Sequence, residues 1–266
     1  MMTWLGIENK VIIVTGGSSG IGQAIVEELL ANGAKVANFD LTKQTDENEC
    51  LLFIKTDISS RSEVENAVQE VVEHWGTVDG LVNNAGINIP CLLVDQQQPY
   101  SKYELSDDIF ERLVAVNQKG LYLVSQAVSR ILVKKQSGAI VNMASEAGLE
   151  GSEGQGIYAA TKAAAYSFTR SWAKELGRHG IRVVGVAPGI MEATGLRTLA
   201  YEEALAYTRG KTVEAIREGY SSVDTIPLGR SGKLKEVADL VLYYLSDRSS
   251  YISGITTNVS GGKTRG

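Results

Sequence analysis

Tyr158 and Lys162 are the residues of this sequence whose types and spacing most directly suggest chemistry. A separation of four residues on a helix places both side chains on one face. An ammonium group beside a phenol stabilises the phenolate and so lowers the pKa of the phenol. Tyr158 would then act as general acid and base for a hydroxyl that loses its proton as hydride leaves carbon. Ser145 ends an apolar run 13 residues earlier, where its hydroxyl would hydrogen-bond the substrate oxygen.

A glycine-rich segment would provide the binding place for a dinucleotide. Residues 15–22 read Thr-Gly-Gly-Ser-Ser-Gly-Ile-Gly and lie between a β-branched run and a helical pattern. Glycines let the backbone approach a pyrophosphate, and the N-terminus of the following helix offers free N–H donors. The predicted phosphate-binding residues are Gly16, Ser18, Ser19, Gly20, Ile21 and Gly22. A Tyr-x-x-x-Lys pair alone is more often an ordinary helix-surface pair, but this segment and Ser145 together favour the catalytic interpretation.

Asp40 ends the next apolar run and predicts the choice of cofactor. A carboxylate at this point of a strand–helix–strand unit accepts hydrogen bonds from the ribose hydroxyls of adenosine and repels a 2′-phosphate. We therefore expect NAD rather than NADP, and Lys43 nearby would weaken that preference.

Alternating apolar runs and helical patterns must position these residues. The expected strands cover 11–15, 35–40, 51–56, 78–83, 139–143, 181–187 and 255–259, and the expected helices cover 20–32, 60–75, 107–135, 157–178, most of 193–219, and 235–246. Most strands are continuous apolar runs, which is typical of a parallel sheet buried on both faces. The order predicts an α/β fold: a single doubly wound Rossmann-type domain over residues 1–266, with about seven parallel strands and helices on both faces. Segments 87–106 and 189–227 follow strand ends and exceed ordinary loop lengths, and we expect 189–227 to form a substrate lid.

Together these motifs resemble the short-chain dehydrogenase/reductase family. The resemblance extends over the whole chain and rests on residues 15–22, Asn-Asn-Ala-Gly at 83–86, Asn117, Ser145, Tyr158 with Lys162, and Pro188-Gly189. It implies hydride transfer between a nicotinamide cofactor and an alcohol/ketone pair, with Asn117 holding a water in a proton relay to Lys162. It further implies cofactor contacts from Asp57 and Ile58 at the adenine and from Asn84, Ala85, Gly86, Tyr158 and Lys162.

The resemblance leaves the nicotinamide end of the site open. Pro188, Gly189 and the residues that follow would meet the carboxamide, with Met191 among the candidates from Ile190 to Thr194. The family often has a threonine four residues after this glycine, whereas Thr194 lies five after it. Family resemblance also suggests a homotetramer or homodimer built on the helices at 107–135 and 157–178.

A finer resemblance concerns the substrate. Residues 117–128, 143–155, 189–214 and the chain's last segment resemble family members that interconvert sorbitol 6-phosphate and fructose 6-phosphate with NAD. Glu146 and Glu192 would accept polyol hydroxyls, and Arg197, Arg209 and Lys211 would bind the phosphomonoester. Each charge taken singly is more often a solvated helix face.

Three alternatives remain open at this point: a reductase of 3-oxoacyl thioesters, an enzyme for unphosphorylated polyols or sugars, and a non-catalytic nucleotide-sensing protein. The retained Asn117, Ser145, Tyr158 and Lys162 argue against the sensor, which does not need a proton relay. An acyl-thioester reductase would be expected to have a more apolar lid.

Composition excludes several other classes. The 266 residues carry a net charge of −5, which offers no basic field for nucleic acid or an anionic membrane. Two cysteines and two histidines without metal-ligand spacing argue against a metal site. No basic-then-apolar leader opens the chain, and no apolar run approaches the ~18 residues that span a bilayer. We expect a cytoplasmic enzyme with a small-molecule substrate.

Overall fold

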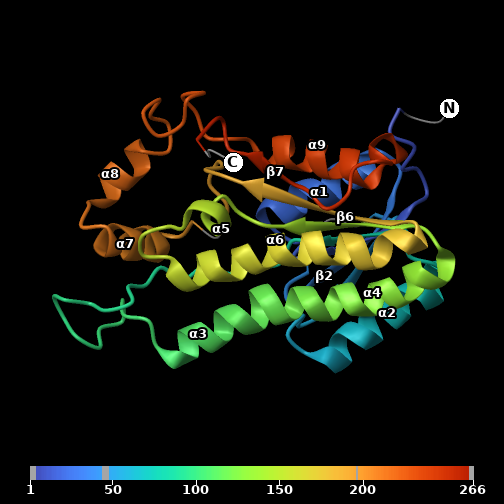
Figure 1. The fold of residues 1–266 in the computed structure, drawn as a ribbon, viewed down its shortest axis with the longest axis horizontal. Coiled ribbons are helices and arrows are strands. Elements are labelled where there is room, and N and C mark those ends of the chain that lie inside the picture. The colour runs from blue at the N-terminus through green and yellow to red at the C-terminus, as the bar shows by residue number, and fades with distance from the viewer. Residues whose placement is uncertain (1–3, 44–47, 196, 264–266) are drawn as a thin grey trace.

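A computed structural model describes residues 4–43, 48–195 and 197–263. Within them, seven parallel strands form one sheet in the order β3-β2-β1-β4-β5-β6-β7 (Figure 1). The strands are β1 (Val11–Thr15), β2 (Lys35–Asp40), β3 (Leu51–Lys55), β4 (Gly80–Asn83), β5 (Gly138–Met143), β6 (Ile181–Pro188) and β7 (Thr256–Val259). The strand order reverses between β1 and β4, and this arrangement confirms the predicted doubly wound α/β fold.

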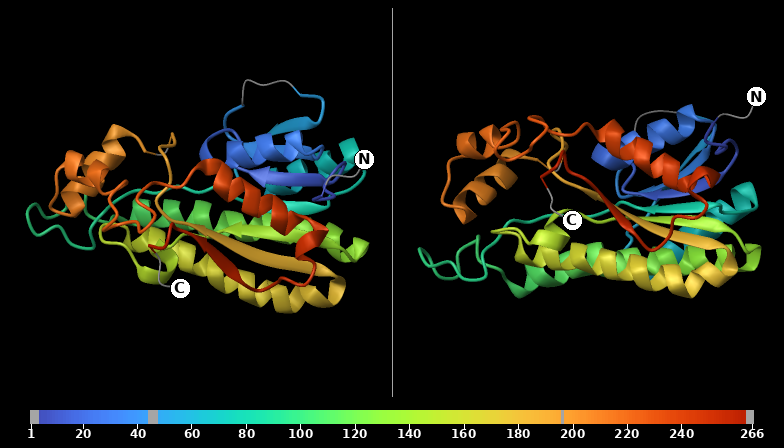
Figure 2. Two further views of the ribbon diagram at one scale, coloured as in Figure 1. Left: turned by 90° about the horizontal axis from the view of Figure 1, so that it is seen from above. Right: turned by 45° about the horizontal axis from the view of Figure 1, so that its top comes forward.

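Helices cover both faces of the sheet, as predicted (Figure 2). One layer holds α1 (Gly20–Ala31) and α9 (Leu234–Leu245), whose apolar side chains share a core cluster with β1 and β6. The other layer holds α2 (Arg61–Trp75), α4 (Leu121–Lys135) and α6 (Gly156–Leu176), which pack with Val11, Ile13 and Ile140 in a second cluster. Strands β1 and β4 are buried throughout, which explains their unbroken apolar sequences.

The predicted helix at 107–135 is not continuous. The chain forms α3 (Asp107–Val114), then a π-helix at Ala115–Gly120, and then α4. Single π-turns of this kind occur mostly at functional sites, and this one contains Asn117. Hydrophobic periodicity did not distinguish this turn from α-helix.

The segment at 193–219 is mostly helical, as predicted, but its helical part is divided. Residues 193–195, 197 and 198 are not helical, and two short helices follow, α7 (Leu199–Thr208) and α8 (Val213–Glu218). Thr198 and Thr212 cap them, each accepting a hydrogen bond from a backbone N–H of the first turn. A short helix that the periodicity did not indicate, α5 (Ala147–Glu150), follows β5.

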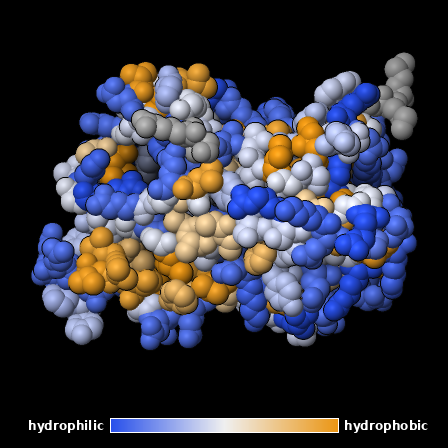
Figure 3. All heavy atoms as spheres, in the orientation of Figure 1, coloured by the Kyte–Doolittle hydropathy of each residue, from blue (hydrophilic) through white to orange (hydrophobic). Residues whose placement is uncertain are grey.

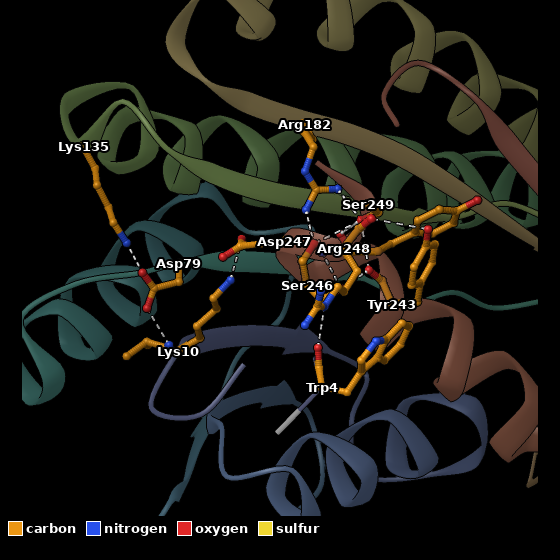
Figure 4. Close-up of polar contacts among 12 residues, drawn as sticks. Trp4, Lys10, Asp79, Lys135, Arg182, Tyr243, Ser246, Asp247, Arg248 and Ser249 are labelled. Atoms are coloured by element: carbon orange, nitrogen blue, oxygen red, sulfur yellow. Dashed lines mark hydrogen bonds and ion pairs between the residues drawn. The ribbon is translucent and has the colours of Figure 1, made fainter. Parts of the chain in front are cut away.

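The regions at the two ends of the strands differ in construction. At the amino ends of the strands, which we call the amino edge, Lys10 pairs with Asp247 at 3.0 Å, Lys135 pairs with Asp79, and Arg182 donates to Ser246 and Ser249 (Figure 4). At the carboxyl edge, α7, α8 and the loop at 87–106 extend beyond the strands (Figure 1). Ligands of open α/β sheets bind at the carboxyl edge, so the long loops lie where a site is expected. None of the helices in the described ranges is both long and apolar enough to cross a membrane.

Candidate active site

Tyr158, Lys162 and Ser145 meet at the carboxyl edge. Tyr158 and Lys162 lie in the first two turns of α6, and Ser145 follows β5. The Tyr158 phenol is hydrogen-bonded to the Ser145 side chain. Lys162 Nζ lies 5.8 Å from the centroid of the Tyr158 ring and donates to the Met143 carbonyl oxygen at 2.8 Å. The spacing in the sequence therefore places a hydroxyl, a phenol and an ammonium side by side.

Burial sets the protonation of this group. It lowers the pKa of Lys162 to about 8, because desolvation disfavours the ammonium. Burial also raises the pKa of Tyr158, and the Ser145 hydrogen bond offsets part of that rise. The sequence predicts the opposite direction for Tyr158, from the proximity of Lys162. In the folded chain desolvation outweighs that proximity, and Lys162 directs its ammonium to Met143.

Asn117 is buried in the π-helix beside this group. Its side-chain oxygen accepts from Ile87 N at 2.8 Å, and its amide nitrogen donates to Ile87 O at 2.9 Å and to Thr161 Oγ1 at 3.1 Å. A Cβ added to Gly86 would lie 3.3 Å from Asn117 Oδ1 and 3.5 Å from Lys162 Nζ. Asn117 thus holds the backbone that follows β4 against α6. At Gly86 this backbone lies close to Lys162 Nζ.

The glycine-rich segment has the backbone that a phosphate cradle needs. Gly16 and Gly20 have φ of +67° and +56°, the left-handed region that favours glycine. A Cβ on Gly22 would lie 2.0 Å from the Gly16 carbonyl oxygen, so α1 approaches the cradle closely. Ser19 is the N-cap of α1, yet its side chain caps no N–H, and no acidic residue lies in the first turn. The N–H donors of Gly20, Ile21 and Gly22 therefore remain for a ligand.

Asn38 is a residue of this site that sequence analysis missed. It is fully buried in β2, accepts from Gly17 N at 3.0 Å and donates to Ser18 Oγ at 2.9 Å. Asp40, at the end of the same strand, accepts from Ser18 N at 3.0 Å and from Leu41 N at 2.7 Å. The sequence does indicate a role for Asn38, because an asparagine inside an apolar strand needs a hydrogen-bond partner for its amide.

The residues after β4 and β3 are ordered by short polar contacts. Asn84 donates its amide to Thr15 O and Gly16 O, both at 3.0 Å, and Ala85 N donates to Thr15 Oγ1. Asp57 accepts from Ser59 N and Ser59 Oγ, while Ile58 is buried against Gly120. The carboxyl ends of β1, β3 and β4 thus lie together at one edge of the sheet.

The segment after Pro188 turns back over the cradle. Gly189 N donates to Val259 O at 2.9 Å, and Met191 is buried against Gly232. A Cβ on Gly20 would lie 3.3 Å from Thr194 Cβ, so Thr194 contacts the start of α1. The threonine displaced by one position therefore still lies beside the phosphate cradle.

The five substrate candidates do not form one group. Glu146 pairs with Lys263 at 2.6 Å, and Glu192 accepts from Leu234 N at 2.9 Å, at the start of α9. The Arg197 guanidinium donates to Met191 O at 2.5 Å and lies 3.9 Å from the centroid of the Tyr220 ring. Arg209 donates to Ser152 Oγ at 3.0 Å and to Glu153 O at 3.2 Å, and Lys211 is exposed.

Helix α7 is anchored to the segments that surround Tyr158. Tyr207 OH donates to the buried Asp95 at 2.8 Å and its ring stacks on Tyr103 at 4.2 Å, which joins α7 to the loop at 87–106. Glu202 and Arg217 join α7 to α8 through an ion pair at 2.6 Å. Helices α7 and α8 therefore form a packed unit with its own small apolar cluster.

The residues present fit a nicotinamide dinucleotide. A cradle with positive-φ glycines, the open N–H donors of α1 and a carboxylate at the end of β2 match its pyrophosphate and adenosine ribose. The Ser145–Tyr158–Lys162 group lies at the same edge of the sheet, where a hydride donor or acceptor would face it.

This fold and site define an oxidoreductase of the Rossmann type, and the comparisons with known proteins agree. The short chain dehydrogenase family model matches residues 10–204, and the chain belongs to that family. The sorbitol-6-phosphate 2-dehydrogenase of Klebsiella pneumoniae is 59% identical over 268 residues, which cover 100% of both chains.

More distant relatives share the architecture. The 3-oxoacyl-[acyl-carrier-protein] reductase of Thermotoga maritima is 36% identical over 96% of this chain and 98% of its own. A crystal structure of a Brucella melitensis 3-ketoacyl-(acyl-carrier-protein) reductase complexed with NADH superposes with a TM-score of 0.80 at 28% identity, over 97% of this chain and 99% of that chain. The family resemblance predicted from the motifs is thereby confirmed.

Proposed function

We propose that this enzyme interconverts sorbitol 6-phosphate and fructose 6-phosphate with NAD. The observation that carries the proposal is the 59% identity to the Klebsiella enzyme over the full length of both chains. The geometry supports it, because a phenol, a hydroxyl and an ammonium converge where a ketone oxygen would bind.

In ketone reduction, Tyr158 donates its proton to the carbonyl oxygen while Ser145 donates a hydrogen bond to the same oxygen. When bound, the reduced cofactor would supply the hydride for the carbonyl carbon. With a raised pKa, the phenol of Tyr158 is protonated at neutral pH and so holds the proton that it donates. Lys162 keeps its ammonium beneath the ring of Tyr158. Asn117 holds the backbone of Ile87, and a water bound there would relay protons to Lys162.

Asp40 supports the preference for NAD. Its carboxylate already accepts from the backbone N–H groups of Ser18, Leu41 and Thr42, and one carboxylate oxygen accepts only from Ser18 among the described residues. That oxygen would accept a ribose hydroxyl, and its charge would repel a 2′-phosphate. The reductase structure complexed with NADH is consistent with this choice.

The remaining cofactor contacts extend the proposal along the same edge. Gly16, Ser18, Ser19, Gly20, Ile21 and Gly22 would hold the pyrophosphate, Asp57 and Ile58 the adenine, and Asn84, Ala85, Gly86, Pro188, Gly189 and Met191 the ribose and nicotinamide. On the substrate side, Arg209 and Lys211 would hold the phosphate and Glu146 a hydroxyl. Glu192 and Arg197 would act more through lid structure. Glu192 accepts from Leu234 N at the start of α9, and the Arg197 guanidinium is held both by Met191 O and by the face of the Tyr220 ring.

The likeness to acyl-carrier-protein reductases favours one alternative, reduction of a 3-oxoacyl thioester. The polar side chains of Asn88, Gln155 and Tyr201 lie beside Tyr158 and suit a polyol better than an acyl chain. The test is loss of the NADH absorbance band with fructose 6-phosphate, fructose and a 3-oxoacyl thioester, repeated with NADPH. We expect turnover with fructose 6-phosphate and NADH. A preference for the thioester would overturn the proposal.

We further propose that the chain, as one domain over residues 1–266, assembles into a homotetramer or homodimer through α4 and α6. A groove between these helices is lined by Tyr122, Gln126, Arg130, Trp172 and Glu175, among others. Apolar surface also gathers at one end of the molecule in Figure 3. Leu93, Val94 and Phe110 are among the exposed large apolar side chains. Light scattering on the purified protein measures the assembly, and a monomer would contradict it. Because its proposed reactants are sugar phosphates, we propose that the enzyme acts in the cytoplasm.

A further inference from the structure

Three polar side chains from separate segments meet beside Tyr158. The Tyr201 hydroxyl oxygen accepts from Gln155 Nε2 at 2.8 Å and from Asn88 Nδ2 at 3.4 Å. Tyr201 lies in α7, Gln155 is the N-cap of α6, and Asn88 follows the backbone that Asn117 holds. We call Asn88, Gln155 and Tyr201 the polar cluster.

The polar cluster lies on the substrate side of the catalytic group. Gln155 precedes Tyr158 by three residues at the start of the same helix, and Tyr158 is close enough to affect the Tyr201 phenol electrostatically. Gly154, with φ of +72°, lies against Thr208 of α7, so the turn before Gln155 is packed onto the lid helix. The cluster is therefore a fixed contact between lid and catalytic helix.

Two hydrogen-bonding groups of the cluster have no protein partner among the described residues. Asn88 Oδ1 is buried and accepts no hydrogen bond. Tyr201 acts as acceptor in both of its hydrogen bonds, which leaves its own proton for another acceptor. Burial raises the pKa of Tyr201 to about 12, so this phenol keeps its proton. A buried acceptor without a donor is costly, and such an atom in a folded protein calls for an explanation.

One acceptor and one donor side by side complement a hydroxyl group, which both donates and accepts. We propose that the polar cluster binds a hydroxyl on a carbon next to the reacting carbonyl, with Asn88 Oδ1 as acceptor and Tyr201 OH as donor. The enzyme would thereby select α-hydroxy ketones and vicinal polyols. This inference rests on the proposed function, since fructose 6-phosphate carries hydroxyls on both carbons that flank its carbonyl.

The competing explanation is that the cluster only fastens the lid. Tyr207 provides a matched control, because it lies in the same helix and fastens the lid to Asp95, and no hydrogen bond joins it to the cluster among the described residues. A fastening role predicts that Tyr201→Phe and Tyr207→Phe act alike on every substrate. A binding role predicts that Tyr201→Phe acts only on substrates that carry the hydroxyl.

The experiment compares kcat/KM for fructose 6-phosphate with that for its 1-deoxy and 3-deoxy analogues, in wild type, Tyr201→Phe, Asn88→Leu and Tyr207→Phe. We expect the wild-type enzyme to prefer fructose 6-phosphate over one analogue by about tenfold or more, as for loss of one buried hydrogen bond. Tyr201→Phe and Asn88→Leu should remove most of that preference, and Tyr207→Phe should keep it. NADH binding, followed by fluorescence, should be unchanged in all three variants.

The outcomes separate the two proposals. Equal losses on all substrates in Tyr201→Phe, matching those in Tyr207→Phe, would overturn the polar-cluster inference and leave the proposed function intact. If the wild type reduces no fructose 6-phosphate, the proposed function is wrong, and the same variants are compared on hydroxyacetone and acetone. Equal wild-type rates on these two ketones would overturn the inference as well.

Discussion

Lys162 lies beneath Tyr158, with its Nζ 5.8 Å from the phenol ring centroid and directed at the Met143 carbonyl oxygen 2.8 Å away. The ammonium is therefore held by the end of β5 rather than by the phenol. This arrangement fixes the lysine next to the catalytic phenol, at the cost of burying its charge. It also makes the proton on Lys162 sensitive to pH near 8.

Tyr158→Phe tests the acid/base assignment. The variant loses only the oxygen that carries the proton, so we expect turnover to fall by roughly 10²–10⁴-fold or more. NADH binding should persist, because the cradle at residues 16–22 is untouched. Steady-state rates with fructose 6-phosphate and a fluorescence titration with NADH measure the two effects. Near-normal turnover would refute the mechanism.

Lys162→Met tests the cost of burying the ammonium. Burial lowers the lysine pKa from 10.5 to about 8, so between these values the unfolded chain holds more protons than the folded one. The free energy of unfolding contributed by Lys162 therefore rises with pH across this window, by about 3 kcal/mol in total, and is constant below it. We would measure the free energy of unfolding of both proteins in urea from pH 7 to pH 10.5. The value for the wild type should rise by that amount relative to the value for Lys162→Met. Parallel curves would contradict the burial argument.

Asp40→Asn tests the cofactor preference more cleanly than removal of the side chain. Asparagine keeps an oxygen for Ser18 N but carries no charge to repel a 2′-phosphate. We expect the ratio of kcat/KM for NADH over NADPH to fall, with the fold retained. Asp40→Ala, which also releases Ser18, should weaken NADH binding further. An unchanged ratio in both variants would assign the preference to another residue, with Lys43 the first to examine.

Single replacement of Arg197, Arg209 and Lys211 by glutamine tests the phosphate site. A charge-assisted contact contributes roughly 1.5–3 kcal/mol, so loss of a true phosphate ligand should reduce use of sorbitol 6-phosphate about tenfold or more while sparing sorbitol. We expect this selective loss for Arg209 and Lys211. Arg197→Gln should affect both substrates equally, because its guanidinium already contacts Met191 and Tyr220. Equal losses for all three would place the phosphate elsewhere, and Lys263 beside Glu146 is then the next candidate.

The order of elements and the local geometry of the catalytic pair follow from short-range patterns in the sequence. Strands at 11–15 and 35–40 were predicted with the bounds that the structure shows, and Tyr158 and Lys162 share a helix face as their spacing requires. These features depend on backbone periodicity and on neighbours within a few residues. A strand that is buried on both faces of the sheet is a continuous apolar run in the sequence, and so it can be recognised there.

How distant segments meet, and which charge states result, depends on the packing of the whole folded chain. Asp95 binds Tyr207 across 112 positions, and Glu146 pairs with Lys263 across 117, contacts that no local pattern encodes. The pKa of Tyr158 moves opposite to the direction that its neighbour in the sequence suggests, because desolvation is set by everything packed around the phenol. Hydrophobic periodicity describes one face of one helix, whereas the burial and the electrostatic environment of a side chain depend on every residue packed around it.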